Sequence, residues 1–258
     1  MKRYYFKVLA TALVFGLTMS APVAAKVKPD EKSSSLTQEQ GDAILKELRQ
    51  IRQLLEKMVK ADSQRAAQSA PGAAGVKVQI GESPSMGSPS APLTMVEFMD
   101  YQCFFCRQFY QNSFAELKKN YIDTGKLRYV VRDFPLSIHA DATRAAQAAH
   151  CAGAQEQYWP MRNALISNQK NLSQDALLEY AKGLKLDMSR FRTCLTSGNY
   201  LAEIEHSQEE AESIDISGTP SFVLGKTTPD GVVGVKIQGA QPYATFEAKI
   251  KKLLAKTQ

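Results

Sequence analysis

The sequence predicts an α/β domain that is interrupted by an all-helical insert and preceded by a separate N-terminal helix. Segments with strand patterns occur between residues 76 and 134 and again after residue 220. Between residues 137 and 213 such patterns are absent, and helix-prone segments follow one another instead. Because strands on both sides of the insert can pair into one sheet, a single α/β domain is the simplest architecture.

The chain begins with the pattern of a secretory signal peptide at residues 1–25. Basic residues among the first seven precede an apolar segment at residues 8–21, and small residues follow that segment. We expect cleavage after Ala25 and export to the periplasm, where cysteines can form stable disulfides. An uncleaved membrane anchor is the alternative interpretation.

The net charge of the chain argues against a nucleic-acid partner. The 258 residues include 32 Lys and Arg against 26 Asp and Glu, a formal charge of +6. Without the signal peptide, 29 basic residues remain against 26 acidic ones, so the charge falls to +3. Such a mild balance is not typical of proteins that bind nucleic acids.

Residues 26–62 are predicted to form a helical oligomerisation segment, with a T-x-x-Q capping box that starts at Thr37. Its apolar residues repeat with spacings of four and three, which is a coiled-coil seam. Leucine at the a positions with isoleucine at d favours trimers or tetramers over dimers. We expect a homo-oligomer, a dimer or a trimer. The repeat covers only about two and a half heptads, so a helix packed on its own domain is the alternative. The seam residues are Ile44, Leu48, Ile51, Leu55 and Met58.

Small and polar residues at 63–75, interrupted by proline and glycine, predict a flexible linker. The α/β domain is assigned to residues 76–258. Strand patterns at 76–81 and 93–100 enclose a turn-rich stretch at 82–92.

A helix is expected from Cys103 to about residue 123, ending near Gly125, and a further strand covers residues 126–134. The insert covers about residues 137–213 and contains five helix-prone segments. Two strands at 221–225 and 233–239 follow it, and an amphipathic helix runs from about residue 243 to residue 255.

Cys103 and Cys106 form a C-x-x-C pair directly after an apolar strand. Structural zinc needs four ligands, and the chain has no second C-x-x-C and no closely spaced histidines, so we expect no metal. A purely structural bond across so short a loop would restrict the unfolded chain little. If a helix begins at Cys103, its free N–H groups and dipole stabilise a thiolate there. Cys106 lies one turn further in, so the pattern favours a redox pair in which Cys103 attacks and Cys106 resolves.

Several motifs resemble those of the DsbA-like thiol-disulfide oxidoreductases, which have a thioredoxin fold interrupted by a helical domain. These motifs are GSPSAPLTMVEFMDYQCFFC, the later DFP, the insert segments AAHCAGAQEQYW and FRTC, and ISGTPSFVLG. The resemblance covers about residues 76–258. It implies that Cys103 is the attacking thiol and Cys106 the resolving one. It also implies that Thr219 and Pro220 form a cis-proline loop whose backbone pairs with substrate peptide.

The resemblance assigns roles to three more residues. Glu97 matches the acidic residue that the family buries under the second cysteine, where it could take up and return the Cys106 proton. A glutamate on the surface of the strand is the alternative. Cysteines near Cys151 and Cys194 in the family imply a structural disulfide within the insert, and two free buried thiols are the alternative there.

The Phe104-Phe105 pair departs from the Pro-His pair of DsbA. Neither phenylalanine provides a polar donor or a cation, so we expect the Cys103 thiolate to be less stabilised and the pair less oxidising than in DsbA. An apolar rim around Cys103 would also suit unfolded protein substrates, which expose apolar side chains.

Together, these features predict an exported thiol-disulfide oxidoreductase that forms or isomerises disulfides in secreted proteins. Isomerase activity is favoured because an oligomer would present several Cys103 sites to one substrate. A dithiol oxidase of the DsbA type and a non-catalytic holdase or adaptor for unfolded proteins are the alternatives. We expect no organic cofactor. The expected partners are unfolded or misoxidised secreted proteins and, by resemblance, a membrane redox protein of the oxidising or the reducing branch.

Overall fold

The computed structural model describes residues 37–68 and 75–256, except for the side chains of residues 58–68. The chain divides into two compact units, one up to Gln68 and one from Ser69. The predicted signal peptide at residues 1–25, the side chain of Met58 and residues 69–74 of the predicted linker lie outside the described residues.

The first unit contains a single described helix, α1 (Gln38–Gln68). The predicted capping box is present. The amide of Thr37 donates to Oε1 of Gln40 at 3.1 Å, and the amide of Gln40 donates to Oγ1 of Thr37 at 3.3 Å. The helix continues through residues 63–68, which were predicted as linker, because the Gln, Arg and Ala residues there are good helix formers.

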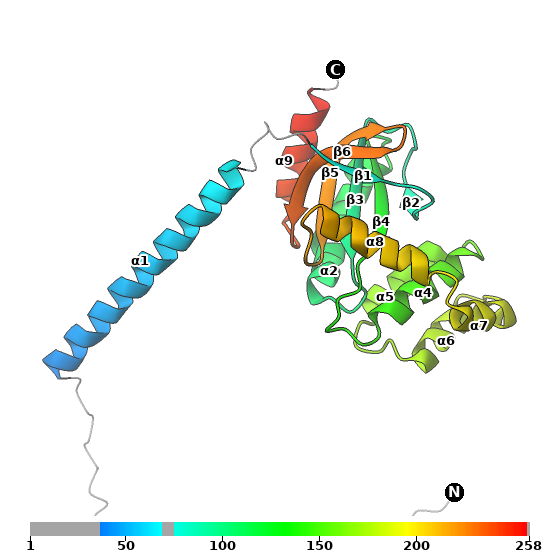
Figure 1. Ribbon diagram of the computed structural model, residues 1–258, viewed down its shortest axis with the longest axis horizontal. Helices are drawn as coiled ribbons and strands as arrows, with labels where there is room; N and C mark the ends of the chain where they lie inside the picture. Colours follow the sequence, from blue (N-terminus) through cyan, green and yellow to red (C-terminus); the bar gives the residue numbers. More distant parts are fainter. Residues whose placement is uncertain (1–36, 69–74, 257–258) are drawn as a thin grey trace, which may run out of the picture. The chain divides into compact units, whose positions relative to one another are not determined.

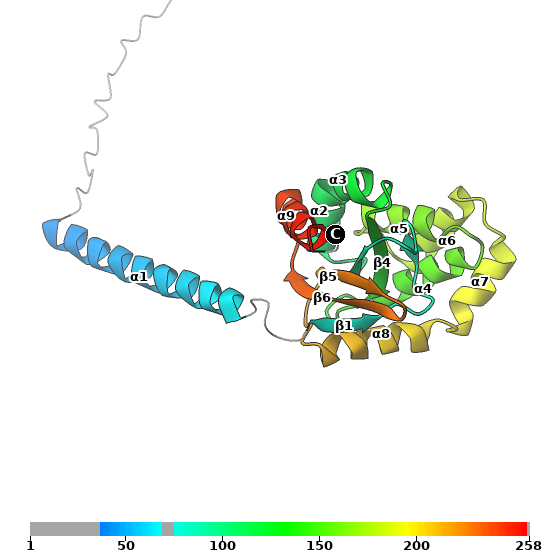
Figure 2. The same cartoon turned by 90° about the horizontal axis from the view of Figure 1, so that it is seen from above.

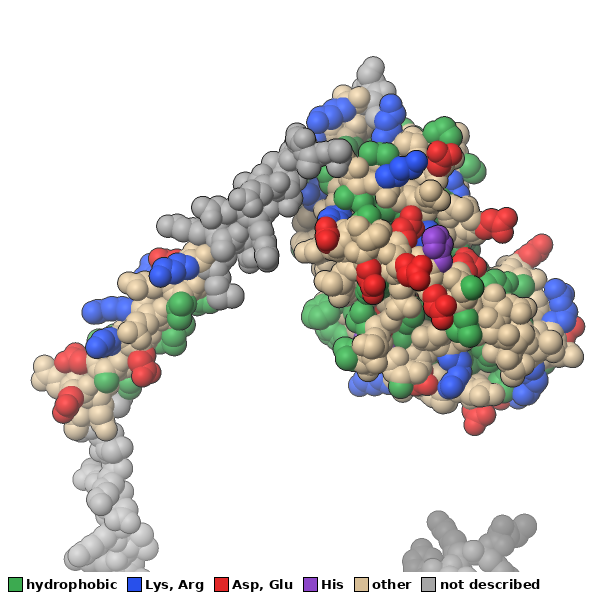
Figure 3. All heavy atoms as spheres, in the orientation of Figure 1, with side chains coloured by type: hydrophobic (Ala, Val, Ile, Leu, Met, Phe, Trp, Pro, Cys, Tyr) green, Lys and Arg blue, Asp and Glu red, His purple; other side chains and the backbone are tan. Residues whose placement is uncertain are grey.

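The apolar seam of α1 is exposed. The exposed fraction of the residue is 45% at Ile44, 55% at Leu48, 51% at Ile51 and 56% at Leu55. Figure 3 shows hydrophobic side chains along this helix. A row of large apolar side chains that are half exposed to water is typical of an interaction surface.

Six strands of the second unit form one sheet in the order β1-β6-β5-β3-β4-β2 (Figure 1). The neighbours β3 and β4 are parallel, with Leu93 opposite Leu127, and the other neighbours are antiparallel. The short strand β2 arises in a stretch predicted as turns, because Ser85 and Met86 pair with β4. The strands are β1 (Val76–Gln79), β2 (Ser85–Met86), β3 (Leu93–Met99), β4 (Leu127–Asp133), β5 (Ser221–Thr228) and β6 (Gly231–Gln238).

Helices cover both faces of the sheet (Figure 2). The larger core lies on one face of the sheet. It is covered there by the helical segment after Cys103, the insert and the C-terminal helix α9 (Tyr243–Leu254). A smaller cluster on the other face includes Val96 and Phe98 of β3 and Ala211 of the helix α8 (Leu201–Ser213). Because side chains alternate along a strand, Glu97 faces the larger core together with Met95 and Met99.

The predicted helix after Cys103 is one continuous helical segment that contains π-helical turns. Its parts are α2 (Phe104–Phe109), η1 (Tyr110–Phe114), α3 (Ala115–Leu117) and η2 (Lys118–Ile122). It ends as predicted near Gly125, which takes a left-handed conformation with φ 71°.

The insert contains the five predicted helices. Two of them begin at side-chain caps. Ser173 accepts a hydrogen bond from the Ala176 amide at the start of α6, and Asp187 accepts two from Ser189 and Arg190 at the start of α7. Among the described residues, no helix is both long and apolar enough to cross a membrane. The helices are α4 (Ala142–Gly153), α5 (Tyr158–Ser167), α6 (Gln174–Gly183), α7 (Met188–Ser197) and α8 (Leu201–Ser213).

Candidate active site

The turn after β3 places Cys103 at the N-terminus of α2. The Asp100 side chain accepts a hydrogen bond from the Gln102 amide at 2.6 Å, and the Asp100 carbonyl accepts one from the Cys103 amide at 3.2 Å. Cys103 is the N-cap residue, with extended backbone angles, and 5% of it is exposed. Cys103 and Cys106 are both free thiols. Because Cys103 is the N-cap residue, the unpaired N–H groups at the start of the helix point towards its sulfur.

The surroundings of Cys103 favour its thiolate. Hydrogen bonding from Cys106 lowers the pKa of the Cys103 thiol to about 6, against the opposing effect of partial burial. The amides of Phe105 and Cys106 lower it further. This pKa lies above the value of about 3.5 for the corresponding thiol of DsbA. That the Phe104-Phe105 pair makes the cysteines less oxidising than those of DsbA stays a prediction for a redox titration.

Cys106 lies inside the helix, with 1% of its surface exposed. Burial raises the pKa of the Cys106 thiol well above its usual value, and the hydrogen bond with Cys103 and the charge of Glu97 raise it further. One thiol of the pair is thus readily ionised while the other holds its proton.

The loop before β5 faces Cys103. The peptide bond between Thr219 and Pro220 is cis, and the Cys103 thiol donates to the Thr219 carbonyl at 3.3 Å. The structure therefore brings together the two motifs that lie more than 100 residues apart in the sequence.

Glu97 is fully buried, so the alternative of a surface glutamate is wrong. It lies close enough to Cys103 and Cys106 for their charges to act on one another. Its Oε2 atom lies 3.0 Å from Nη2 of Arg162 and accepts a hydrogen bond from the Tyr129 hydroxyl. Burial raises the pKa of Glu97, and the charge of Arg162 and the hydrogen bond from Tyr129 partly offset that effect.

Three residues of this site were missed by the sequence analysis. Tyr129 and Arg162 contact Glu97, and Gln169 donates from Nε2 to the Cys103 carbonyl at 2.7 Å. Arg162 and Gln169 come from the insert, far from the C-x-x-C in sequence. No short motif marks them, because only the packing of the insert against the sheet brings them to the site.

Residues 79–252 match the family model described as Thioredoxin. The chain belongs to the thioredoxin family. A DsbA-like member is indicated by the crystal structure of Wolbachia pipientis α-DsbA1, which has 28% sequence identity and a TM-score of 0.63. That match covers 69% of this chain and 94% of the α-DsbA1 chain. BdbD from Bacillus subtilis, in its oxidised form, has the same fold at 23% identity and a TM-score of 0.60, over 70% of this chain and 99% of BdbD.

This chain also matches one part of much longer proteins, the Na(+)/H(+) antiporters. The Na(+)/H(+) antiporter NhaA 3 of Salinispora tropica is 32% identical over 161 residues, or 62% of this chain. The match spans 24% of the antiporter. NhaA of Herminiimonas arsenicoxydans is 32% identical over 165 residues, which are 64% of this chain and 24% of that protein.

The comparisons and the geometry agree on a DsbA-like thiol-disulfide oxidoreductase with a thioredoxin fold and a helical insert. In this oxidoreductase, Phe104 and Phe105 are exposed by 61% and 55% and contact each other edge to face. They form an apolar rim next to Cys103. Among the described residues, no group of three or more His, Cys, Asp or Glu side chains is placed to hold a metal ion.

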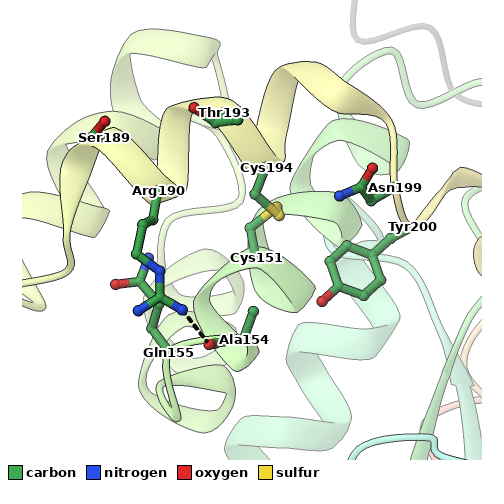
Figure 4. Close-up of a pocket in the computed structure, with 9 residues that line it drawn as sticks. All are labelled: Cys151, Ala154, Gln155, Ser189, Arg190, Thr193, Cys194, Asn199 and Tyr200. Atoms are coloured by element: carbon green, nitrogen blue, oxygen red, sulfur yellow. Dashed lines mark hydrogen bonds between the residues drawn. A yellow bond between two sulfur atoms is a disulfide. The ribbon is translucent and has the colours of Figure 1, made fainter.

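The two remaining cysteines are bonded in the structure, as the family resemblance implied. Cys151 of α4 and Cys194 of α7 form a disulfide with a Cα–Cα distance of 5.7 Å. The bond lies in a pocket of about 380 Å³ with Arg190 and Tyr200 in its wall (Figure 4). Cys151 is 1% exposed and belongs to the larger core. The disulfide therefore joins two helices of the insert.

The pKa values predict selective alkylation of the reduced protein. Iodoacetamide reacts with thiolates, so the rate of Cys103 modification should rise with pH around a midpoint of about 6. Cys106 should stay unmodified across that range, because its thiol is buried and protonated. Mass spectrometry of digested peptides measures both rates. A midpoint near the usual thiol pKa of about 8.5 would contradict the prediction.

Proposed function

We propose that this oxidoreductase rearranges wrongly paired disulfides of exported proteins by thiol-disulfide exchange at Cys103 and Cys106. The Cys103 thiolate attacks a substrate disulfide, a mixed disulfide forms, and one substrate cysteine leaves as a thiolate. That thiolate can then attack another disulfide within the substrate, and the substrate thiolate released there attacks the mixed disulfide. This last exchange returns the Cys103 thiolate and leaves the number of electrons unchanged. If no rearrangement follows, Cys106 attacks Cys103 and releases the substrate in reduced form.

The exposed seam of α1 is the observation that carries isomerisation over simple oxidation. Helices that pair through Ile44, Leu48, Ile51 and Leu55 would hold several Cys103 sites near one substrate. Linked sites act at a high effective concentration, which suits the repeated breaking and forming of bonds in one chain.

Substrate binding is supported by the surroundings of Cys103. The backbone of Thr219 and Pro220 offers pairing to an extended peptide, and the exposed rings of Phe104 and Phe105 offer contact to apolar side chains. We therefore propose unfolded or misoxidised exported proteins as substrates in the periplasm. A membrane redox protein is the proposed partner that keeps the cysteine pair in its working state.

A dithiol oxidase is the second candidate, and the lowered pKa of Cys103 favours it. A stabilised thiolate makes Cys103 a good leaving group and favours the reduced pair, so the oxidised pair donates its disulfide to substrates.

The test is recovery of activity from a scrambled, fully oxidised multi-disulfide substrate in a mildly reducing glutathione buffer. Strong recovery by the wild-type protein that is lost with Cys103→Ser supports the isomerase. Rapid oxidation of a reduced substrate without recovery of the scrambled one supports the oxidase. Suppression of substrate aggregation that Cys103→Ser leaves unchanged, without either exchange activity, supports a holdase.

Charged residues in the seam should separate the oligomer. The double variant Leu48→Asp/Ile51→Asp places carboxylates where apolar side chains would pack, so it should sediment as a monomer. It should keep exchange with a small peptide and lose recovery of the scrambled substrate. Gln50→Asp/Gln53→Asp adds the same charge at other exposed positions of α1 and serves as the control. A wild-type protein that sediments as a monomer would remove the argument for isomerisation.

A further inference from the structure

Arg162 occupies an unusual position for an arginine. It is the largest fully buried side chain in the described part of the chain. Its guanidinium carbon lies 5.3–5.8 Å from the centres of four aromatic rings. Aromatic faces attract a cation, and the attraction is stronger where water is excluded. These rings come from three different elements and are those of Tyr110, Phe114, Tyr129 and Trp159.

The charged partner of Arg162 within the described residues is Glu97. Nη2 of Arg162 donates to Oε2 of Glu97 at 3.0 Å and to the Tyr129 hydroxyl at 2.7 Å. The Nε and Nη1 atoms of Arg162 are buried and make no hydrogen bond to the described residues. Nη2 is therefore the guanidinium nitrogen that binds the Glu97 carboxylate.

We propose that Arg162 is a positioning residue for exchange, because it holds Glu97 as the carboxylate that takes up the proton of Cys106. The inference rests on the exchange function proposed above. In that step the Cys106 proton moves to Glu97, and the Cys106 sulfur attacks the Cys103 sulfur of the mixed disulfide. The bond between Cys103 and the substrate breaks, the bond between Cys103 and Cys106 forms, and the substrate leaves as a thiolate.

The physical reason is the cost of a buried charge. A carboxylate that is fully removed from water takes up a proton unless an opposite charge lies next to it. A protonated Glu97 has no place for the Cys106 proton. Oε2 of Glu97 already accepts from Arg162 and Tyr129, whereas Oε1 is buried without a hydrogen-bond partner among the described residues. Oε1 is therefore the atom that can accept a proton.

The source of Arg162 gives the insert a part in the chemistry. Glu97 lies on β3 and Arg162 on α5, so the two charges meet only when the insert packs against the sheet. Gln169, which follows α5, donates a hydrogen bond to the Cys103 carbonyl. The insert thus contributes two side chains to the site.

The test is the pH profile of the resolving step in Arg162→Met. Single-turnover reduction of a peptide disulfide is followed at peptide concentrations where attack by Cys106 limits the rate. Loss of the cation should raise the midpoint of the profile by about one pH unit or more, with a rate about tenfold lower on its acidic limb. Arg162→Lys keeps the charge and should restore a midpoint close to that of the wild type.

Arg132→Met is the matched control. Arg132 is also buried and pairs with a carboxylate, Glu210, at 2.8 Å, but its hydrogen-bond partners Ser207 and Gln79 lie outside the cysteine site. This variant should keep the wild-type midpoint. A folded Arg162→Met protein with the wild-type midpoint, or an equal displacement in Arg132→Met, would overturn the proposal. A wild-type protein that does not reduce the peptide would instead refute the exchange function itself.

Stability provides a second readout that does not depend on activity. In Arg162→Met the pKa of Glu97 should lie further above its unfolded value. The contribution of Glu97 to the unfolding free energy is then fully present below its pKa in the unfolded state. It is lost as the pH rises through its pKa in the folded state. The difference in unfolding free energy between wild type and variant should therefore be larger at pH 7 than at pH 5. An equal difference at both pH values would count against the proposal. Arg162→Gln allows the same measurement if the methionine variant does not fold.

Discussion

Replacing Cys103 with serine should reduce thiol-disulfide exchange to the rate of the buffer alone. A serine hydroxyl forms no disulfide and is not ionised near neutral pH, so the attacking group is lost completely. Cys106 cannot take over the role, because 1% of it is exposed and its thiol stays protonated. The measurement is the rate of peptide disulfide reduction by the reduced protein.

Cys106→Ser is the informative counterpart. This variant keeps the Cys103 thiolate and loses the group that resolves the mixed disulfide, so a covalent complex with substrate should accumulate. Non-reducing electrophoresis and intact mass measure the complex, and the double variant with Cys103→Ser should form none. Accumulation of a complex through Cys106 in Cys103→Ser would reverse the assignment of the two thiols.

Removal of the disulfide between Cys151 and Cys194 should lower the unfolding free energy of the domain strongly. Cys151 and Cys194 are 43 residues apart, and closing a loop of that length restricts the unfolded chain by about 4 kcal/mol. The variant Cys151→Ala/Cys194→Ala should lose an unfolding free energy of that order. Exchange at 25 °C should persist, because Cys103 and Cys106 lie outside the α4 and α7 helices.

Urea unfolding of the second unit measures the loss. The comparison is best made in a Cys103→Ser/Cys106→Ser background, so that a reductant acts only on the insert bond. Reductant should then destabilise the background protein by about as much as the alanine substitutions do. A loss below about 1 kcal/mol would mean that the unfolded chain is already restricted in this region.

The secondary structure could be predicted closely where the signal is local. The strands at Leu93–Met99 and Leu127–Asp133 and the five insert helices follow from hydrophobic periodicity and helix propensity, which depend on neighbouring residues alone. The strand at Ser85–Met86 could not be predicted, because two residues carry no periodicity and the strand exists only through its pairing with β4.

The candidate site divides in the same way. Cys103, Cys106 and the Thr219-Pro220 pair were found because each belongs to a short motif with its own chemistry. Glu97 stayed ambiguous in the sequence, since alternation gives a strand two faces and does not say which of them is covered. In the structure helices cover both faces, so the glutamate is buried whichever way it points.

By itself the sequence determined the C-x-x-C pair at the start of a helix, the order of the longer strands and helices, and the capped helix with its apolar seam. These depend on spacing along the chain, which the backbone geometry of helices and strands converts directly into shared faces. Only the tertiary structure decided the state of Glu97. The pKa of Glu97 reflects burial by the whole domain and the charge of Arg162, 65 residues away. Desolvation and Coulomb interactions depend on distance in space, and the packing of the insert sets that distance.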